Sequence, residues 1–195
     1  AAAIFFLISA GGFYSRLRYI RKSKATLQEE KDRSENLLLN ILPAEIAAEL
    51  KETGKAVARD FERVSVLFTD FKEFTQASEK MSAGMLVDEI NACFEVFDVI
   101  LEKYHVEKIK TIGDAYMAAG GLPVPTDDSV KNTVLAALEI QDFITKRKTE
   151  LDAVNKPAFE MRAGIHTGAV VAGIVGMKKF QYDIWGDTVN TASRI

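Results

Sequence analysis

The sequence is poor in the residues that build disulfides and zinc sites. Its 195 residues include one cysteine and two histidines. The lone Cys93 cannot form an intrachain disulfide, and its apolar surroundings predict a buried thiol in a reducing compartment.

A basic excess is also absent, because 25 Lys and Arg residues are balanced by 28 Asp and Glu residues. This balance predicts no nucleic-acid partner, and the 48% hydrophobic content indicates a globular protein.

Long apolar runs are scarce as well. Residues 1–13 are uncharged, but a bilayer requires roughly 20 apolar residues. Five cations follow this stretch: Arg16, Arg18, Arg21, Lys22 and Lys24. Apolar residues followed by cations are typical of the cytoplasmic end of a transmembrane helix, whereas a signal peptide has the reverse order. We predict that residues 1–15 are the end of such a helix in the plasma (inner) membrane, with the remaining chain on the cytoplasmic side. A buried soluble helix is the alternative.

Residues 16–54 are predicted to be helical, with a break at Pro43 and an end at Gly54. Within this segment a repeat of alternating three- and four-residue steps indicates a heptad seam with apolar ends and a polar middle. The seam consists of Leu17, Ile20, Lys24, Leu27, Lys31, Ser34, Leu38 and Ile41. We predict a parallel coiled-coil stalk that joins two chains and transmits a signal. A solvated single helix remains the alternative.

We expect a globular domain over residues 55–195. Apolar alternation and helical periodicity place its elements in the order β-α-β-β-α-β. This order is typical of an α+β ferredoxin-like sandwich, in which helices cover one face of an antiparallel sheet. The expected strands span residues 62–69, 106–112, 115–122, 159–166, 170–175 and 180–185. The expected helices span residues 81–104 and 127–151, and a third begins at residue 187.

Two local details follow from the same patterns. In the helix over 127–151 the apolar residues expected to point inward are Val130, Val134, Leu138 and Ile140. Thr167 and Gly168 are expected to join two separate strands.

Two aspartates are candidates for a metal site. Asp70 follows an apolar strand, and Asp114 lies in a Gly-Asp turn between two strands. Carboxylates without cysteine or paired histidine ligands suit a hard ion such as Mg²⁺ or Mn²⁺. Backbone N–H groups after Phe71, up to Phe74 and Thr75, can face an anion. Together these features favour phosphoryl or nucleotidyl transfer, although each aspartate alone could be an ordinary turn or cap residue.

Lys110 and Asp183 are charged residues inside strands and are candidates for base recognition. In a regular strand Lys108 and Lys110 point to one face and Ile109 to the other. A lysine donor and an aspartate acceptor match the edge of adenine, which offers an acceptor at N1 and a donor at its amino group. Guanine requires the reverse arrangement.

Asn190 and Arg194 are four residues apart on the expected terminal helix and would share one face. An arginine can neutralise charge that develops on a phosphate, and an asparagine can orient a ribose; a surface pair is the alternative. His105 and His166 lie at expected element ends, and we interpret both as structural.

Four ordered motifs, at residues 68–75, 108–117, 164–173 and 185–194, resemble class III nucleotidyl cyclases. Residues 36–43 resemble the membrane-proximal signalling helix of membrane-bound members. The resemblance implies an adenylate cyclase that makes 3′,5′-cyclic AMP and pyrophosphate from ATP. It implies that Asp70 and Asp114 hold two Mg²⁺ or Mn²⁺ ions, with the Phe71 carbonyl as a further ligand. Lys110 and Asp183 would select adenine, since guanylate-making relatives carry Glu and a small residue such as Cys there.

By the same resemblance Asn190 would orient the ribose and Arg194 would stabilise the transition state. The family works as a dimer with composite sites, so we expect a homodimer in which each site takes its metal pair from one chain and the remaining groups from the other. The family also has a later lysine that binds the triphosphate, and we expect this chain to be a fragment that ends before it. The alternatives are a guanylate or dual-specificity cyclase, and a non-catalytic dimeric module that senses nucleotide.

Overall fold

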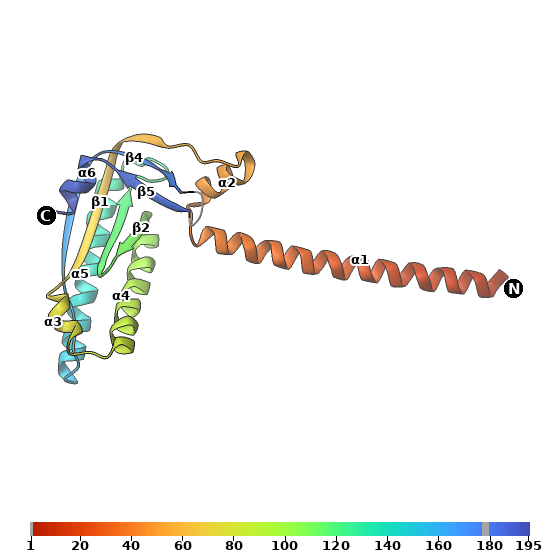
Figure 1. Ribbon diagram of the computed structural model, residues 1–195, viewed down its shortest axis with the longest axis horizontal. Coiled ribbons are helices and arrows are strands. Elements are labelled where there is room, and N and C mark those ends of the chain that lie inside the picture. Colours follow the sequence, from red (N-terminus) through yellow and green to blue (C-terminus); the bar gives the residue numbers. More distant parts are fainter. Residues whose placement is uncertain (1, 177–179) are drawn as a thin grey trace. The chain divides into compact units, whose positions relative to one another are not determined.

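The computed structural model describes residues 2–176 and 180–195 and divides into two units, Ala1–Ala47 and Ala48–Ile195. The first unit consists of helix α1 (Ala2–Leu39) and the beginning of α2 (Ala44–Thr53), separated by a turn that contains Pro43 (Figure 1). The predicted break at Pro43 is therefore confirmed, whereas Ala1 lies outside the described residues. None of the helices in the described ranges has a stretch that is both long and apolar enough to cross a bilayer.

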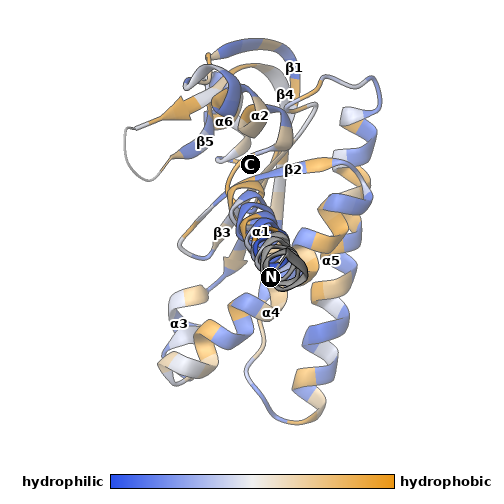
Figure 2. Ribbon diagram, turned by 90° about the vertical axis from the view of Figure 1, so that its right-hand side faces the viewer, coloured by the Kyte–Doolittle hydropathy of each residue, from blue (hydrophilic) through white to orange (hydrophobic). Residues whose placement is uncertain are grey.

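Several apolar positions of the heptad seam are solvent-exposed in the single chain. Leu27 is 71% exposed and Ile20 is 44% exposed, and Ile41 just beyond the helix is 62% exposed. Figure 2 shows that hydrophilic and hydrophobic residues are mixed along this helix. Pairing of two such helices remains a prediction.

The second unit is built around a five-stranded antiparallel sheet with strand order β2-β3-β1-β4-β5. Its strands are β1 (Arg59–Lys72), β2 (Val106–Ile112), β3 (Ala115–Gly120), β4 (Glu160–Val175) and β5 (Gln181–Trp185). Its helices are α3 (Phe74–Ser78), α4 (Ala83–Lys103), α5 (Ser129–Ala153) and α6 (Asp187–Ala192). The order β2-β3-β1-β4 is that of a ferredoxin-like sandwich, so the predicted α+β class is confirmed, with β5 added at one edge.

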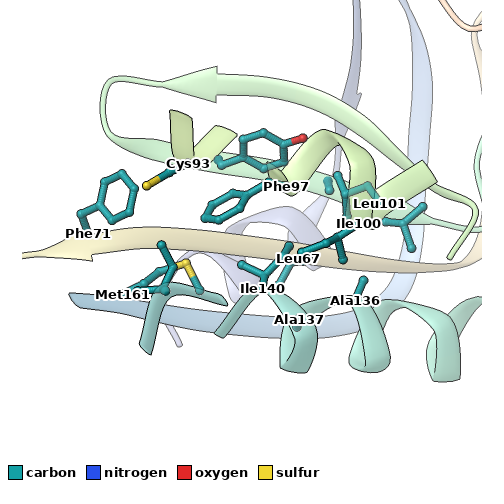
Figure 3. Close-up of a cluster of buried hydrophobic side chains, with 14 of the residues drawn as sticks. Leu67, Phe71, Cys93, Phe97, Ile100, Leu101, Ala136, Ala137, Ile140 and Met161 are labelled. Carbon is teal, nitrogen blue, oxygen red and sulfur yellow. The ribbon is translucent and has the colours of Figure 1, made fainter. Parts of the chain in front are cut away.

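The hydrophobic core lies between one face of the sheet and helices α4 and α5 (Figure 3). Leu67 and Phe71 of β1 enter it from the sheet, and the Phe71 ring stacks on Phe159 with centroids 4.5 Å apart. Since strand side chains alternate between faces, Phe68 and Asp70 project from the opposite face. This second face carries the candidate site.

The prediction of which α5 residues point inward is wrong except for Ile140. Val134 is 40% exposed and Leu138 is 61% exposed, and Val130 is only half-buried. The buried positions are instead Ser129, Thr133, Ala136, Ala137, Ile140 and Ile144. Small side chains allow α5 to approach the sheet closely: a Cβ on Gly120 would lie 2.2 Å from the Thr133 hydroxyl.

The predicted turn at Thr167 and Gly168 is also wrong, because β4 is one continuous strand. Thr167 lies opposite Ser65 of β1, and their hydroxyls are 2.9 Å apart. Gly168 provides room for α6 rather than a turn: a Cβ at this position would lie 2.6 Å from the Thr188 hydroxyl.

Lys108 and Lys110 do not share a face of β2 as predicted. Lys108 lies opposite Ala118 and Lys110 lies opposite Met117, which are neighbours on β3, so β2 contains one extra residue. This bulge at Ile109 breaks the alternation and sends the two lysines to opposite faces of the sheet.

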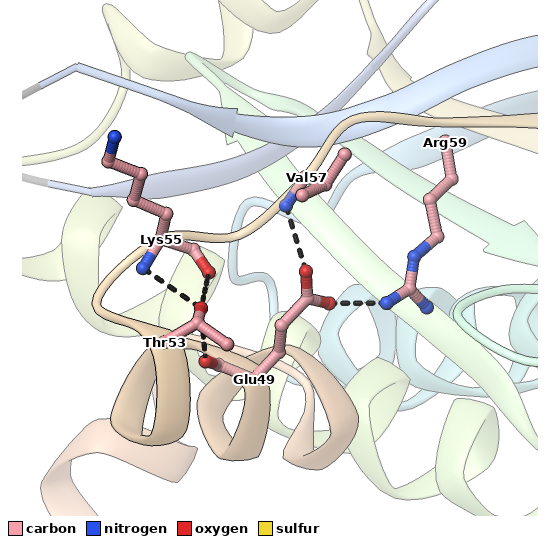
Figure 4. Close-up of polar contacts among 5 residues, drawn as sticks. All are labelled: Glu49, Thr53, Lys55, Val57 and Arg59. Atoms are coloured by element: carbon pink, nitrogen blue, oxygen red, sulfur yellow. Dashed lines mark hydrogen bonds and ion pairs between the residues drawn. The ribbon is translucent and has the colours of Figure 1, made fainter.

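The connection from α2 to β1 is held by Glu49. Its carboxylate accepts a hydrogen bond from the Val57 amide at 3.0 Å and pairs with the Arg59 guanidinium (Figure 4). The Thr53 hydroxyl contacts the carbonyls of Glu49 and Lys55 and closes the end of α2. The chain therefore enters β1 along a defined path.

Candidate active site

Asp70 belongs to a row of side chains that crosses the open face of the sheet. It lies opposite Ala115 of β3 and Arg162 of β4, and Ile112 of β2 lies opposite Ala115. Asp70 does not end its strand as predicted, because β1 continues to Lys72 by pairing with β4. Its carboxylate is therefore held by the sheet rather than by a loop.

The second carboxylate, Asp114, lies next to Asp70 in the two-residue turn between β2 and β3. Gly113 adopts φ 64° there, a conformation that glycine accepts without strain. Partial burial raises the pKa of Asp114, and the charge and hydrogen bonding of Asp70 raise it further. A carboxylate whose ionisation is hindered by a neighbouring carboxylate favours a nearby cation.

Arg162 supplies that cation in the structure. Its Nε and Nη2 donate to Asp70 Oδ2 at 2.9 and 2.5 Å. Sequence analysis did not identify Arg162, because its closeness to Asp70 depends on the β1–β4 register across 92 residues of chain. The signal in the sequence was a charged residue in the middle of an expected strand.

A cavity of about 360 Å³ adjoins these groups. Asp70, Arg162 and Arg194 contribute its charged side chains, and Phe68 and Ile112 contribute apolar surface. The structure therefore places Arg194 and Asp70 around the same cavity within one chain. Asn190 is not among the residues that line this cavity.

Asn190 lies in α6, whereas Arg194 lies beyond the end of this helix rather than on it as predicted. Helix α6 ends at Ala192, and the Arg194 amide donates to the Thr191 carbonyl in a turn beyond it. Asn190 is an exposed residue of α6, and its carbonyl accepts a hydrogen bond from the Ser193 hydroxyl at 2.9 Å.

Lys110 and Asp183 form an ion pair with Nζ and Oδ2 2.5 Å apart. They come from β2 and β5, the two edge strands, so the sheet curls enough to bring its edges into contact. Both side chains are largely buried, with 27% and 13% exposed. The second oxygen of Asp183 accepts from the Ile184 amide at 2.9 Å, which fixes the carboxylate.

The three residues predicted near the phosphates differ in orientation. The Phe71 ring is buried in the core, so only its backbone is available to a ligand. Phe74 is half-buried against the same core, and its ring lies 5.7 Å from Phe159. Thr75 is exposed in α3, which follows Glu73 with φ 51°.

Across the part of the chain that the structure describes, no three His, Cys, Asp or Glu side chains are grouped as a metal centre. Asp70 and Asp114 are thus a pair of carboxylates rather than a closed metal cage. An ion held by this pair would take its remaining ligands from the backbone, water or substrate, as Mg²⁺ commonly does.

Fold and sequence together identify the class of protein. Residues 56–195 match the family described as the adenylate and guanylate cyclase catalytic domain. The chain belongs to this family, and its resemblance to class III nucleotidyl cyclases is confirmed. Nucleotide binding and a lyase reaction are the activities of this class.

Relatives include cyclases of both specificities. The chain is 38% identical over 180 residues to an adenylate cyclase of Mycobacterium tuberculosis, covering 92% of this chain and 40% of the relative. It is 39% identical over 166 residues to guanylate cyclase soluble subunit beta-2 of Rattus norvegicus, covering 85% of this chain and 24% of the relative. The chain thus spans two fifths or less of these relatives.

The similar solved structures also include both guanylyl and adenylyl cyclases. The catalytic core of a rhodopsin-guanylyl cyclase with converted specificity, in complex with ATPalphaS, has a TM-score of 0.65 at 36% identity and covers 70% of this chain and 72% of that one. The adenylyl cyclase CyaB of P. aeruginosa has a TM-score of 0.66 at 27% identity, covering 71% and 72%. Family membership therefore establishes a cyclase domain and leaves the base specificity to the residues of the site.

Proposed function

We propose that this domain is an adenylate cyclase that converts ATP to 3′,5′-cyclic AMP and pyrophosphate. The observation that carries the proposal is the buried ion pair between Lys110 and Asp183. Lysine is a donor only and an ionised carboxylate is an acceptor only. Together they complement the N1 acceptor and amino donor of adenine, whereas guanine would place a donor against lysine and an acceptor against aspartate. Their partial burial keeps the lysine donor and the aspartate acceptor in fixed positions with little access to water.

The carboxylate pair fits two divalent ions, the cofactors expected for this class. Asp70 and Asp114 are close enough for one to raise the pKa of the other, and an arginine already offsets the charge of Asp70. Oxygen donors without sulfur or imidazole suit Mg²⁺ or Mn²⁺. We assign Asp70, Asp114 and the Phe71 carbonyl as ligands. Ions bound there would activate the ribose 3′-hydroxyl and offset charge on the phosphates.

The chain's own side chains would do the remaining work. Arg194, in the cavity with Asp70, would neutralise charge on the phosphates as pyrophosphate leaves. Arg162 lines the same cavity and can turn from Asp70 towards a phosphate. Asn190 would orient the ribose. Backbone groups at Phe74 and Thr75 would contact the phosphate chain.

The test is a nucleotide-specificity assay of the longest natural polypeptide that contains this chain, with Mn²⁺ and either ATP or GTP. Cyclic AMP as the main product supports the proposal. A preference for GTP would disprove the assignment of Lys110 and Asp183 to adenine recognition. Lys110→Glu combined with Asp183→Cys should move preference towards GTP, because each change reverses or removes a hydrogen-bonding group.

A guanylate or dual-specificity cyclase is the second candidate, because several relatives are named guanylate cyclases. A non-catalytic nucleotide-sensing module is the third. Nucleotide binding without turnover, in a polypeptide that extends past Ile195, would favour the third candidate over both enzymes.

We also propose the wider organisation suggested by the sequence. Residues 1–15 would anchor the chain in the inner membrane, 16–54 would pair as a coiled coil, and 55–195 would be the cytoplasmic catalytic domain of a homodimer. Fractionation of cells expressing the natural polypeptide tests the anchor: recovery in the soluble fraction without detergent would contradict it.

A further inference from the structure

Asp98 of α4 lies outside the candidate site but binds both strands of the hairpin that carries Lys110 and Asp114. Its two oxygens accept from Lys108 Nζ of β2 at 2.8 and 2.9 Å. Its Oδ1 also accepts from the Tyr116 hydroxyl of β3 at 2.5 Å. One carboxylate thus ties the helix layer to the two strands that supply a metal ligand and the base-selecting lysine.

Asp98, Lys108 and Tyr116 contact one another. The Tyr116 side chain is fully buried, and the Lys108 ammonium lies 5.1 Å from the centre of its ring. The Tyr116 hydroxyl donates to Asp98, so this carboxylate is the acceptor that satisfies the buried hydroxyl. A buried hydroxyl deprived of its acceptor is costly, so the Tyr116 bond anchors β3 to Asp98, and the more exposed ion pair with Lys108 adds a weaker link to β2.

The pairing of β2 with β3 has one register near the hairpin turn and a register shifted by one residue where Lys108 meets Asp98. At the turn, Ile112 is fixed opposite Ala115, and regular pairing continues to Lys110 opposite Met117. If pairing stayed regular, Lys108 would lie opposite Ala119 on the open face of the sheet. In the structure Lys108 instead lies opposite Ala118 on the helix face, where its ammonium pairs with Asp98.

Both conditions are met only if one extra residue is accommodated between Lys108 and Lys110. That residue is Ile109, which is 8% exposed, and it forms the bulge immediately before Lys110. A bulge bends its strand and redirects the neighbouring side chains. The position of the bulge therefore sets the direction in which Lys110 leaves β2 towards Asp183.

We propose that Asp98 is a positioning residue for base selection: it holds the bulge at Ile109 and thereby aims Lys110 at the purine edge. The inference rests on the proposed role of Lys110 in binding adenine. Without Asp98, the extra residue is free to shift along β2, and the Lys110 ammonium no longer has one fixed direction. Discrimination between ATP and GTP should then fall before turnover does.

The test compares Asp98→Asn with Glu89→Gln in the full chain. Glu89 is a matched control, because it lies on the same helix and pairs with Arg147 of α5 at 2.5 and 2.7 Å, away from the hairpin. Asp98→Asn should lower the ATP-to-GTP ratio of kcat/KM about tenfold, mainly through a higher KM for ATP. Glu89→Gln should reduce stability and leave the ratio unchanged. In Lys110→Ala, adding Asp98→Asn should have no further effect on the ratio.

A second readout does not depend on turnover. Met117 lies opposite Lys110, and Met161 lies in the core on the other face of the sheet, so ¹³C-methyl methionine spectra report the register directly. Asp98→Asn should shift or broaden the Met117 signal and spare Met161, and Glu89→Gln should not affect Met117. An unchanged Met117 signal and ATP-to-GTP ratio in Asp98→Asn would overturn the positioning role. If Lys110→Ala leaves the ratio unchanged, the base assignment itself fails.

Discussion

Asp70 is the residue on which the proposed chemistry depends most directly. Asp70→Ala should lower cyclase activity by at least about 100-fold, because it removes one of two carboxylates available for a divalent ion. The fold should persist, since the side chain is 31% exposed and its partner Arg162 is 69% exposed. Product formation and a thermal melt measure the two effects. Asp60→Ala, an exposed aspartate of the same strand, is the control, and an active Asp70→Ala enzyme would disprove the metal assignment.

Cys93 illustrates a prediction from composition that the structure supports. The thiol is 1% exposed, and burial, reinforced by Glu89, raises its pKa to about 12. At pH 8 the thiolate fraction should fall from about a quarter for an ordinary cysteine to about one in ten thousand. We expect alkylation of the native protein to be slow at pH 8, to accelerate as pH rises towards 12, and to be fast in denaturant. Rapid labelling of the native protein at pH 8 would contradict this.

At the scale of elements, the contact between β4 and α6 depends on Gly168. Gly168→Ala should destabilise the domain by about 1–3 kcal/mol, because its Cβ would lie 2.6 Å from the Thr188 hydroxyl, which itself donates to the Ala169 carbonyl at 2.7 Å. Urea unfolding measures the loss. Thr188→Ala in the same chain should restore part of it by vacating the contact.

Gly84→Ala is the matched control for this substitution, because no atom lies within 4 Å of the added carbon and the residue is in α4. It should leave stability unchanged or raise it by up to about 1 kcal/mol. Equal effects of the two substitutions would show that the approach of α6 to β4 is not tight.

The elements themselves were largely predictable from periodicity, whereas their contacts were not. The β2 strand has the expected bounds, because alternation ends at a Gly-Asp turn that sequence identifies. The inward face of α5 was mispredicted because apolarity favours Val134 and Leu138, while the close approach to the sheet requires small residues. The bulge at Ile109 was also missed, since it arises from the contact of Lys108 with α4.

The same distinction explains the candidate site. Asp70 and Asp114 were found because the first follows an apolar run and the second lies in a Gly-Asp turn, although β1 in fact continues past Asp70. Arg162 was missed because only the pairing of β1 with β4 places it beside Asp70. Lys110 and Asp183 were assigned by chemistry and family resemblance, but their ion pair depends on the curl of the whole sheet, which no local pattern encodes.

At the scale of the whole molecule, two arrangements differ in whether the residues of one active site come from one protomer or from both. The resemblance assigns Asp70 and Arg194 to different protomers, whereas the cavity in a single chain is lined by both. Asp70→Ala and Arg194→Ala would each be inactive alone under either arrangement. Mixed dimers of the two variants distinguish them.

If sites are composite, a mixed dimer has one site with both defects and one intact site, so random mixing of subunits should recover about a quarter of wild-type activity. If each chain completes its own site, mixing recovers nothing. Asp70→Ala mixed with Asp114→Ala is the control, because both residues belong to the same half of the site and no intact site can form. Activity of unfolded and refolded equimolar mixtures provides the measurement. Recovery in the first mixture alone would establish that dimer geometry controls catalysis.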